Sequence, residues 1–210
     1  MSDDSASAYE KHARAFLKAR DRWQTGTDVV ERWARSIGPG TEVLEIGCGG
    51  GFPVTRVLVD AGLKLWAVDS SPTLLSEFRA RFPEIPVVCA RASQSTYFER
   101  KFGAVISIGL VFLLNAQEQA AFIRRASELI VAGGRLLFTA PLEKGTWADT
   151  TTGHECRSLG REQYESILAD AGFRVVATHE DEGRNNYYEA ERVQDGIPAR
   201  NQVLAKVSGR

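Results

Sequence analysis

Residues 43–53 constrain this chain more than any other segment, because a short apolar strand runs directly into a glycine-rich turn and then into a helix. Glycine permits the tight turn and lets the backbone approach a ligand closely. Pro53 suits the first turn of a helix that continues through Leu58. This arrangement is typical of sites that bind a nucleoside cofactor.

The spacing of the glycines indicates which nucleoside cofactor the loop favours. A dinucleotide fingerprint that starts at Gly47 needs its third glycine where Phe52 stands. One that starts at Gly49 needs it where Val54 stands. The pattern that fits is Glu45 followed by glycine at 47, 49 and 51. It resembles the first motif of the class I methyltransferases, which use S-adenosylmethionine (AdoMet).

A second strand and helix follow at the spacing of this family. Residues 63–69 read as a strand that ends in Asp69, about twenty residues after the loop. A carboxylate there can accept hydrogen bonds from both ribose hydroxyls, in NAD-binding folds as well as in methyltransferases, so Asp69 alone does not discriminate between them. Ser71 is the expected N-cap of the next helix, with Pro72 at its first position.

The later part of the chain continues the resemblance to about residue 173. Residues 103–108 and 134–141 are typical of the fourth and fifth strands, and a capping box at Asn115 opens a helix that extends to Val131. The resemblance implies an α/β Rossmann-like fold with a seven-stranded, mostly parallel sheet in the order 3-2-1-4-5-7-6. Helices are expected on both faces, with extra helices at the N-terminus.

The rest of the chain suggests a single domain, 1–210. We expect a helical N-terminal cap over 1–40, a core over 41–193, and a tail over 194–210 that is either a last strand or disordered. Residues 142–159 show little periodicity and predict a long loop. Residues 164–171 have helical spacing, and residues 173–178 and 187–190 have strand patterns.

The composition of the chain limits which classes of partner we expect it to bind. The 210 residues are 43% hydrophobic with a net charge of −1, so no overall basic field favours nucleic acid as a partner. The three cysteines form no redox or zinc spacing, and no histidine pattern indicates a metal site. No apolar run is long enough to cross a bilayer. These features predict a cytoplasmic protein without membrane contacts; they leave its oligomeric state open.

The resemblance also implies cofactor-binding residues. The glycine loop is expected to contact the methionyl and ribose parts, Asp69 the ribose, and the turn after the third strand the adenine. That turn lacks the acidic residue of many relatives, so a backbone carbonyl or Ser93 has to serve. Arg14 or Arg20 is the candidate for the methionyl carboxylate. The predicted cofactor contacts are Tyr9, Glu45, Gly47, Cys48, Gly49, Gly51, Asp69, Ser70, Ala92, Ser93 and Gly109.

Two of these candidates have specific physical arguments. Glu45 can receive the methionyl ammonium, directly or through water, or else accept hydrogen bonds from loop amides. Tyr9, Phe16 and Trp23 recur every seven residues, which keeps them near one face of a helix. An aromatic ring over the sulfonium would gain cation–π attraction, but the same rings can also pack the helix onto the sheet.

The acceptor is less constrained. Residues 109–114 lack the Asn/Asp-Pro-Pro-aromatic signature of base and glutamine N-methyltransferases, which favours a small-molecule acceptor. Phe112 and its leucine neighbours either form an apolar wall that excludes water from the transfer site or belong to the hydrophobic core. A general base, where one is needed, is expected in the late loops. The candidates are His154, Tyr187 and Tyr188, and alternation along a strand predicts that one of the two tyrosines faces the core.

The resulting hypothesis is AdoMet-dependent methyl transfer to an oxygen, nitrogen or sulfur atom of a small molecule. Three alternatives stay open on the sequence: a noncatalytic binding module with the same fold, an RNA or protein methyltransferase that uses a local basic patch, and an NAD-dependent oxidoreductase. The arginines and lysine available for such a patch are Arg79, Arg81, Arg91, Arg100 and Lys101.

Overall fold

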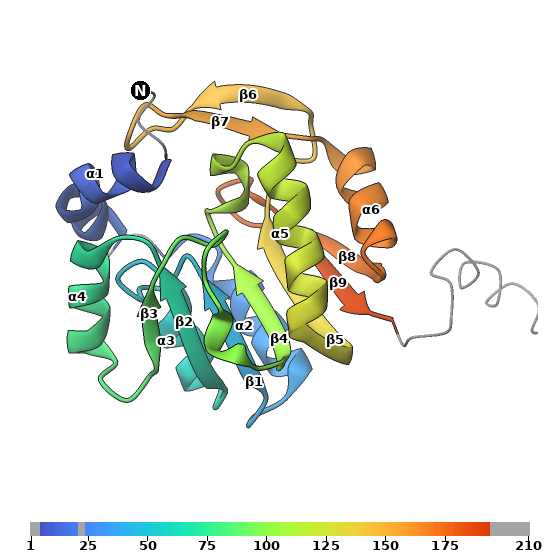
Figure 1. Cartoon of the computed structure of the whole chain (residues 1–210), viewed down its shortest axis with the longest axis horizontal. Helices are drawn as coiled ribbons and strands as arrows, with labels where there is room; N and C mark the ends of the chain where they lie inside the picture. Colours follow the sequence, from blue (N-terminus) through green and yellow to red (C-terminus); the bar gives the residue numbers. More distant parts are fainter. Residues whose placement is uncertain (1–4, 21–23, 194–210) are drawn as a thin grey trace, which may run out of the picture.

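A seven-stranded sheet forms the centre of the protein, and a computed structural model describes residues 5–20 and 24–193 (Figure 1). Neighbouring strands follow the order β3-β2-β1-β4-β5-β9-β8. The strands are β1 (Glu42–Ile46), β2 (Lys64–Asp69), β3 (Val87–Cys89), β4 (Phe102–Ser107), β5 (Ile130–Thr139), β8 (Phe173–Glu180) and β9 (Asn186–Arg192). Numbered within this sheet alone, the order is 3-2-1-4-5-7-6, which confirms the predicted topology.

One strand of the sheet, β9, runs opposite to the others. Strands β3 to β5 pair in parallel through β2, β1 and β4, whereas β9 lies antiparallel between β5 and β8. The carboxyl ends of the parallel strands therefore meet at one edge of the sheet, which is the upper edge in Figure 1. In open α/β sheets this edge is where ligands bind.

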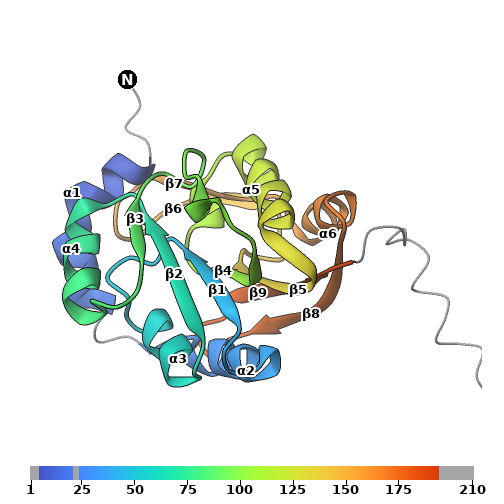
Figure 2. The same cartoon turned by 60° about the horizontal axis from the view of Figure 1, so that its bottom comes forward.

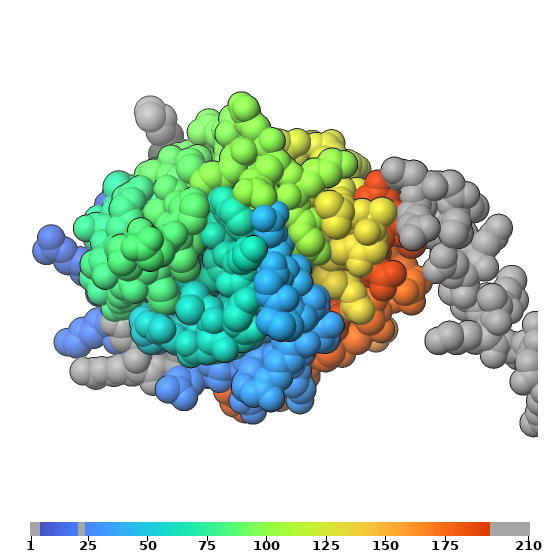
Figure 3. Space-filling model, turned by 90° about the horizontal axis from the view of Figure 1, so that it is seen from below, coloured from blue at the N-terminus to red at the C-terminus, as the bar shows by residue number. Residues whose placement is uncertain are grey.

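Helices cover both faces of the sheet. Figure 2 shows α2 and α3 on one side and α5 and α6 on the other, and from below their segments pack into a continuous surface (Figure 3). The helices are α1 (Ser5–Arg20), α2 (Thr27–Ile37), α3 (Val54–Asp60), α4 (Pro72–Arg81), α5 (Ala116–Leu129) and α6 (Arg161–Asp170), with short 3-10 turns η1 (Tyr97–Glu99) and η2 (Val111–Leu113).

Successive residues of the central strands pack into different cores. Val43 joins the core beneath α2 and α3, whereas Leu44 and Ile46 join the larger core beneath α5 and α6. Because both faces are covered, β1 is buried along nearly its whole length. The predicted helix caps are confirmed at Ser71, which accepts a hydrogen bond from Leu74 N at 3.1 Å, and at the Asn115 capping box.

The prediction of a structureless loop over 142–159 is wrong. Strands β6 (Gly145–Ala148) and β7 (Glu155–Ser158) pair as an antiparallel hairpin outside the main sheet. All four residues of β6 are exposed, so this strand has no alternation of apolar and polar side chains that would reveal it. Asp149 organises the hairpin turn by accepting from Thr151 N at 3.0 Å and from Thr152 N at 2.7 Å.

Two predicted boundaries also shift. Helix α3 begins at Val54, after a cis peptide between Phe52 and Pro53. Strand β5 begins at Ile130, four residues before the predicted start, because Ile130 pairs with Phe102 ahead of a register shift. Trp23 and the predicted tail 194–210 lie outside the described residues, and the division into cap, core and tail stays a prediction. Within the described ranges, no helix is long and apolar enough to span a membrane.

Candidate functional site

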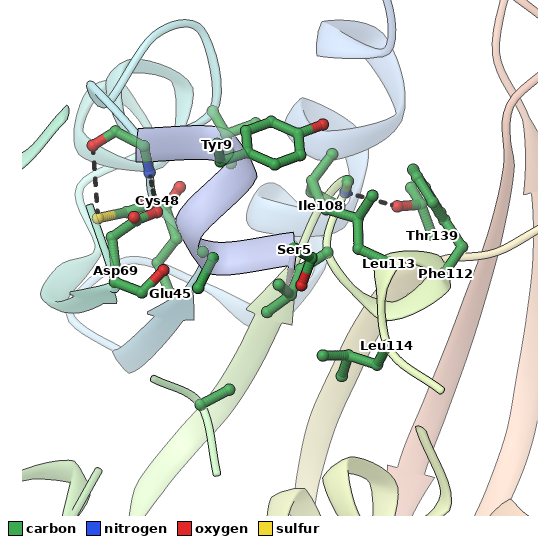
Figure 4. A pocket seen from close by; sticks show the side chains of 18 of the residues that line it. Ser5, Tyr9, Glu45, Cys48, Asp69, Ile108, Phe112, Leu113, Leu114 and Thr139 are labelled. Atoms are coloured by element: carbon green, nitrogen blue, oxygen red, sulfur yellow. Dashed lines mark hydrogen bonds between the residues drawn. The ribbon is translucent and has the colours of Figure 1, made fainter. Parts of the chain in front are cut away.

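A cavity of about 1080 Å³ lies at the carboxyl ends of the parallel strands. The loops after β1, β2, β3 and β4 form its floor, and parts of α1 and of the β6–β7 hairpin cover it. Figure 4 shows two groups of side chains: Glu45, Cys48 and Asp69 on one side, and Ile108, Phe112, Leu113 and Thr139 on the other. In the same view Tyr9 lies between them. We call these groups the strand β1 side and the strand β5 side of the cavity.

The glycine loop is fixed by backbone hydrogen bonds. Gly47 N donates to Val68 O at 2.7 Å, and Gly49 N donates to Asp69 Oδ2 at 2.8 Å. Gly47 and Gly49 have φ of +81° and +56°, which other residue types rarely adopt. Gly47, Cys48, Gly49 and Gly50 line the cavity, so this part of the predicted motif faces the site.

Gly51 does not line the cavity, contrary to the prediction that it contacts the cofactor. A Cβ atom at this position would lie 2.4 Å from Phe82 Cε2 and 3.2 Å from Phe78 Cδ2, and φ is +87°. The glycine is needed because the loop passes directly over the aromatic side chains of α4 and the residue after it. Its role is in packing, although it belongs to the same sequence motif.

Asp69 joins the first two loops of the floor. Its Oδ2 accepts from Gly49 N, and its Oδ1 accepts from Ser71 N at 2.9 Å. Burial raises the pKa of the carboxyl, and the backbone donors oppose that shift. The two carboxylate oxygens together offer about four acceptor sites, so these backbone donors leave room for a ligand. Ser70, also a predicted contact, lines the cavity beside it.

Glu45 is a buried acid at the bottom of the cavity. Only 3% of the residue is exposed, and Oε2 accepts from Thr55 Oγ1 at 2.7 Å. Burial raises its pKa to about 8, and the negative charge of Asp69 adds to the shift, while the Thr55 hydrogen bond and Arg20 oppose it. Glu45 is therefore poised to change its protonation when a cation binds nearby.

Arg20 is the better placed of the two arginine candidates. It lines the cavity and is half-buried, whereas Arg14 is exposed and does not line it. Burial lowers the pKa of Arg20, and the nearby Tyr187, Tyr9 and other acidic groups oppose the shift. Among the residues that the structure describes, no hydrogen bond or ion pair engages its guanidinium.

Helix α1 is anchored over the cavity by two adjacent residues. Tyr9 Oη donates to Asp149 Oδ2 at 3.2 Å, which joins α1 to the β6–β7 hairpin. The neighbouring Glu10 accepts from Thr73 Oγ1 at 2.5 Å and from the Ser71 hydroxyl, at the start of α4. Sequence reasoning missed Glu10 and Asp149, because each contact joins segments more than 60 residues apart.

The turn after β3 completes this side. Ala92 and Ser93 both line the cavity, as predicted adenine contacts would. The Ala92 carbonyl also accepts from the Tyr97 hydroxyl, which fixes the turn. Gly109, after β4, lines the cavity with φ of +78°, and its N–H donates to Thr139 Oγ1 at 2.8 Å.

The three catalytic candidates differ in position. His154 lines the cavity from the β6–β7 hairpin. Tyr187 also lines it, but its hydroxyl donates to Asp181 Oδ2 at 2.8 Å. Burial, with further contributions from Asp181, raises the pKa of Tyr187, so its phenol holds its proton and is a poor base.

Tyr188 does not reach the cavity, and the prediction of a catalytic role for it is wrong. The residue is fully buried and its ring stacks on Phe138, with centroids 5.1 Å apart. The alternation rule placed the two tyrosines on opposite faces, yet Tyr187 is 2% exposed and is buried too. Strand β9 lies between β5 and β8 with both faces covered, so neither face meets solvent.

The wall of the strand β5 side is aromatic. Phe112 in η2 and Trp147 in β6 lie with ring centroids 5.6 Å apart and planes at 45°, and both line the cavity. The predicted apolar wall at Phe112 is therefore completed by a tryptophan from the hairpin. Within the described ranges, no group of three or more histidine, cysteine or acidic side chains could hold a metal ion.

Comparisons with known proteins agree with this geometry. A family model described as a methyltransferase domain matches residues 43–134. The uncharacterized protein Rv2003c of Mycobacterium tuberculosis is 30% identical over an alignment that covers 93% of this chain and 71% of that protein. The probable S-adenosylmethionine-dependent methyltransferase Rv3030 of the same organism is 27% identical over 139 residues, or 65% of this chain. The chain matches only about half the length of that relative, 50%.

Solved structures show the same fold. The glycopeptide N-methyltransferase MtfA, in complex with S-adenosylhomocysteine (AdoHcy), superposes with a TM-score of 0.66 at 20% identity, covering 81% of this chain and 91% of that one. The glycine loop, the carboxylate after the second strand, the strand order and the matched family model agree. The chain belongs to the class I S-adenosylmethionine-dependent methyltransferase family.

Proposed function

We propose that this protein transfers a methyl group from AdoMet to an oxygen, nitrogen or sulfur atom of a small molecule. The observation that carries the proposal is one cavity with two different sides. A carboxylate and a glycine loop form the strand β1 side, and an aromatic wall forms the strand β5 side. Its volume of about 1080 Å³ is at the upper end of the range for ligand sites, as expected for a cofactor and an acceptor together.

The residues of the strand β1 side fit the chemistry of AdoMet. Asp69 has lone pairs left for the ribose hydroxyls, and Arg20 offers a guanidinium for the methionyl carboxylate. We assign Glu45 to the methionyl ammonium and the turn at Ala92 and Ser93 to the adenine, since all three residues line the cavity. When bound, AdoMet supplies a methyl group on a positively charged sulfur.

The protein contributes mainly position and exclusion of water. Alignment of a nucleophile with the methyl group is worth about 7–11 kcal/mol at best, and no further catalyst is needed where the nucleophile is already deprotonated. The hydrogen bond between Tyr9 and Asp149 joins α1 to the β6–β7 hairpin above the cavity. Phe112 and Trp147 make the adjoining wall apolar. His154 is the proposed base for acceptors that must lose a proton. The hydroxyl oxygen of Tyr187 orients the acceptor by accepting a hydrogen bond, while the Tyr187 hydroxyl proton is donated to Asp181.

Titration calorimetry with AdoMet, AdoHcy and NADH tests the cofactor before any acceptor is known. We expect micromolar affinity for the first two and none for NADH. A screen of small metabolites for AdoHcy formation then tests turnover. NADH binding without AdoMet binding would overturn the proposal, and AdoMet binding without turnover on any acceptor class would favour the noncatalytic module.

Specific contacts disfavour the other two alternatives. Arg81 pairs with Glu77 at 2.8 Å and Arg100 pairs with Glu42 at 2.6 Å, so two cations of the candidate basic patch are already engaged by acids. Phe52 stands where a dinucleotide loop needs glycine, and its ring contacts Phe82. Neither an RNA substrate nor NAD is therefore part of the proposal.

A further inference from the structure

We propose that the methyl acceptor has a flat apolar body and carries a negatively charged group. Phe112 and Trp147 would contact the body, and Arg184 would pair with the charge. The inference rests on the proposed function, because the strand β5 side is an acceptor site only if the cofactor occupies the strand β1 side.

The aromatic pair provides a surface for an apolar ring. Phe112 and Trp147 come from segments more than 30 residues apart and meet at a centroid distance of 5.6 Å. Trp147 is 37% exposed, and the other residues of its strand are exposed too, so no core requires a tryptophan at this position. Large aromatic side chains left partly open at a cavity commonly serve as contact surfaces for ligands. Ile108 and Leu113 extend this apolar wall towards the floor of the cavity.

The charges around the cavity favour an anion. Three described acidic residues line it, and none belongs to the aromatic wall: Glu45 and Asp69 lie on the strand β1 side, and Glu118 caps α5 through a hydrogen bond from Asn115 N. Five described arginines line the same cavity: Arg20, Arg81, Arg91, Arg125 and Arg184. Beyond the strand β1 side, an ammonium group would therefore find one carboxylate in the described lining, that of Glu118, which already accepts from Asn115 N.

Two acids in the hairpin and the turn that form the strand β5 side are already used. Asp149 accepts from its own turn and from Tyr9, and Asp181 accepts from Tyr187 and from the β8–β9 turn. Neither is among the described residues that line the cavity. A cationic acceptor would have to break these contacts to reach a carboxylate, whereas an anionic acceptor leaves them intact.

Arg184 is presented to the cavity by a constrained turn. Its φ is +62°, a conformation that is rare for a long side chain. The carboxylate of Asp181 holds the turn by accepting from Gly183 N at 2.9 Å and Asn185 N at 2.8 Å, while Arg184 N donates to the Asp181 carbonyl at 2.9 Å. No hydrogen bond or ion pair links the Arg184 guanidinium to another described residue. Backbone strain of this kind is often retained where it positions a functional group.

Three probes of one shape and different charge test the inference: 2-naphthoate, the neutral 2-naphthamide and the cationic 2-naphthylmethylammonium. Each is titrated into the protein with and without saturating AdoHcy, so the charge preference is measured whether or not AdoHcy binds. We expect 2-naphthoate to bind at least tenfold more tightly than the ammonium compound. We expect Trp147→Ala to weaken all three probes by a similar factor.

Substitution of the arginine isolates the charge. Arg184→Asn should cost 2-naphthoate at least fivefold in affinity and leave 2-naphthamide unchanged, because asparagine tolerates the left-handed backbone at this position. The matched control is Arg174→Asn, which removes the same charge on β8 from a residue paired with Glu191 outside the cavity lining.

Three results would overturn the inference: tighter or equal binding of the ammonium compound, the same loss of 2-naphthoate affinity in both arginine variants, or no binding of any probe. Failure of the proposed function looks different, because AdoHcy itself would not bind. A protein that binds AdoHcy but shows no charge preference contradicts this inference alone.

Discussion

The two sides of the cavity are built in different ways. On the strand β1 side, the decisive contacts join backbone atoms of the glycine loop to Val68 and to Asp69, the last two residues of β2. On the strand β5 side, side chains from η2, the β6–β7 hairpin and the β8–β9 turn converge, and no short motif contains them. A backbone-built site is fixed by a local pattern, whereas a side-chain-built site depends on how distant segments pack.

The largest expected effect tests how tightly the glycine loop is packed. Gly51→Ala should lower the free energy of unfolding by about 3–4 kcal/mol, because the new methyl group would meet the Phe82 ring at 2.4 Å on a left-handed backbone. Gly40→Ala is the matched control, since Gly40 has φ of +79° and no atom within 4 Å of the added Cβ. It should lose only about 1 kcal/mol. Equal losses in urea unfolding would show that packing against Phe82 contributes nothing.

The next effect concerns the cofactor directly. Asp69→Ala should weaken AdoHcy binding by about 2–3 kcal/mol, or roughly 30- to 150-fold, through loss of charge-assisted hydrogen bonds. Calorimetry measures the affinity, and urea unfolding of the same sample checks that the loop still folds without its contact to Gly49 N. Unchanged affinity in a folded variant would remove the ribose assignment.

The pKa of Glu45 makes stability depend on pH. Its pKa is raised from 4.5 to about 8, so between these values the folded state keeps a proton that the unfolded chain has lost. The folded state therefore loses relative stability as pH rises, by about 2 kcal/mol between pH 6 and pH 8.5. Urea unfolding at the two pH values measures this slope.

Glu45→Gln is the control, because it keeps the shape and an acceptor for the Thr55 hydroxyl but cannot titrate. Its unfolding free energy should lack this component and change less over the same range. If the two proteins show the same pH dependence, Glu45 is not the titrating group, and the strand β1 side does not carry a buried neutral acid.

The smallest effects come from two adjacent tyrosines, and only one of the two substitutions should destabilise the protein. Tyr187→Phe should lower the unfolding free energy by about 1 kcal/mol, because its hydroxyl donates to Asp181 at 2.8 Å. Tyr188→Phe should leave stability unchanged or raise it by about 1 kcal/mol, because the buried Tyr188 hydroxyl has no hydrogen-bond partner among the described residues. Thermal unfolding of both variants measures the difference. Equal destabilisation would mean that the two hydroxyls have equivalent surroundings.

Much of the strand β1 side could be predicted from residues 43–71. The glycine loop and Asp69 meet because adjacent parallel strands end at the same edge of the sheet. Gly51 shows the limit of that reasoning: the motif contains it, but the position of Phe82 decides that it packs against α4 and does not face the cavity. The contacts of Glu10 and Asp149 could not be predicted, since they depend on how α1 lies across the molecule.

The sequence by itself determined the helix caps at Ser71 and Asn115 and the glycine loop of the cofactor site, because these depend on short-range spacing and backbone conformation. The order of the strands followed from the resemblance to the methyltransferase family. Only the tertiary structure decided the hairpin, the pairing of Phe112 with Trp147, and the burial of Tyr188. The hairpin is local, but its first strand is exposed at every residue and shows no alternation. The other two features depend on contacts between segments far apart in the chain. Such contacts leave no periodicity in either partner's own sequence.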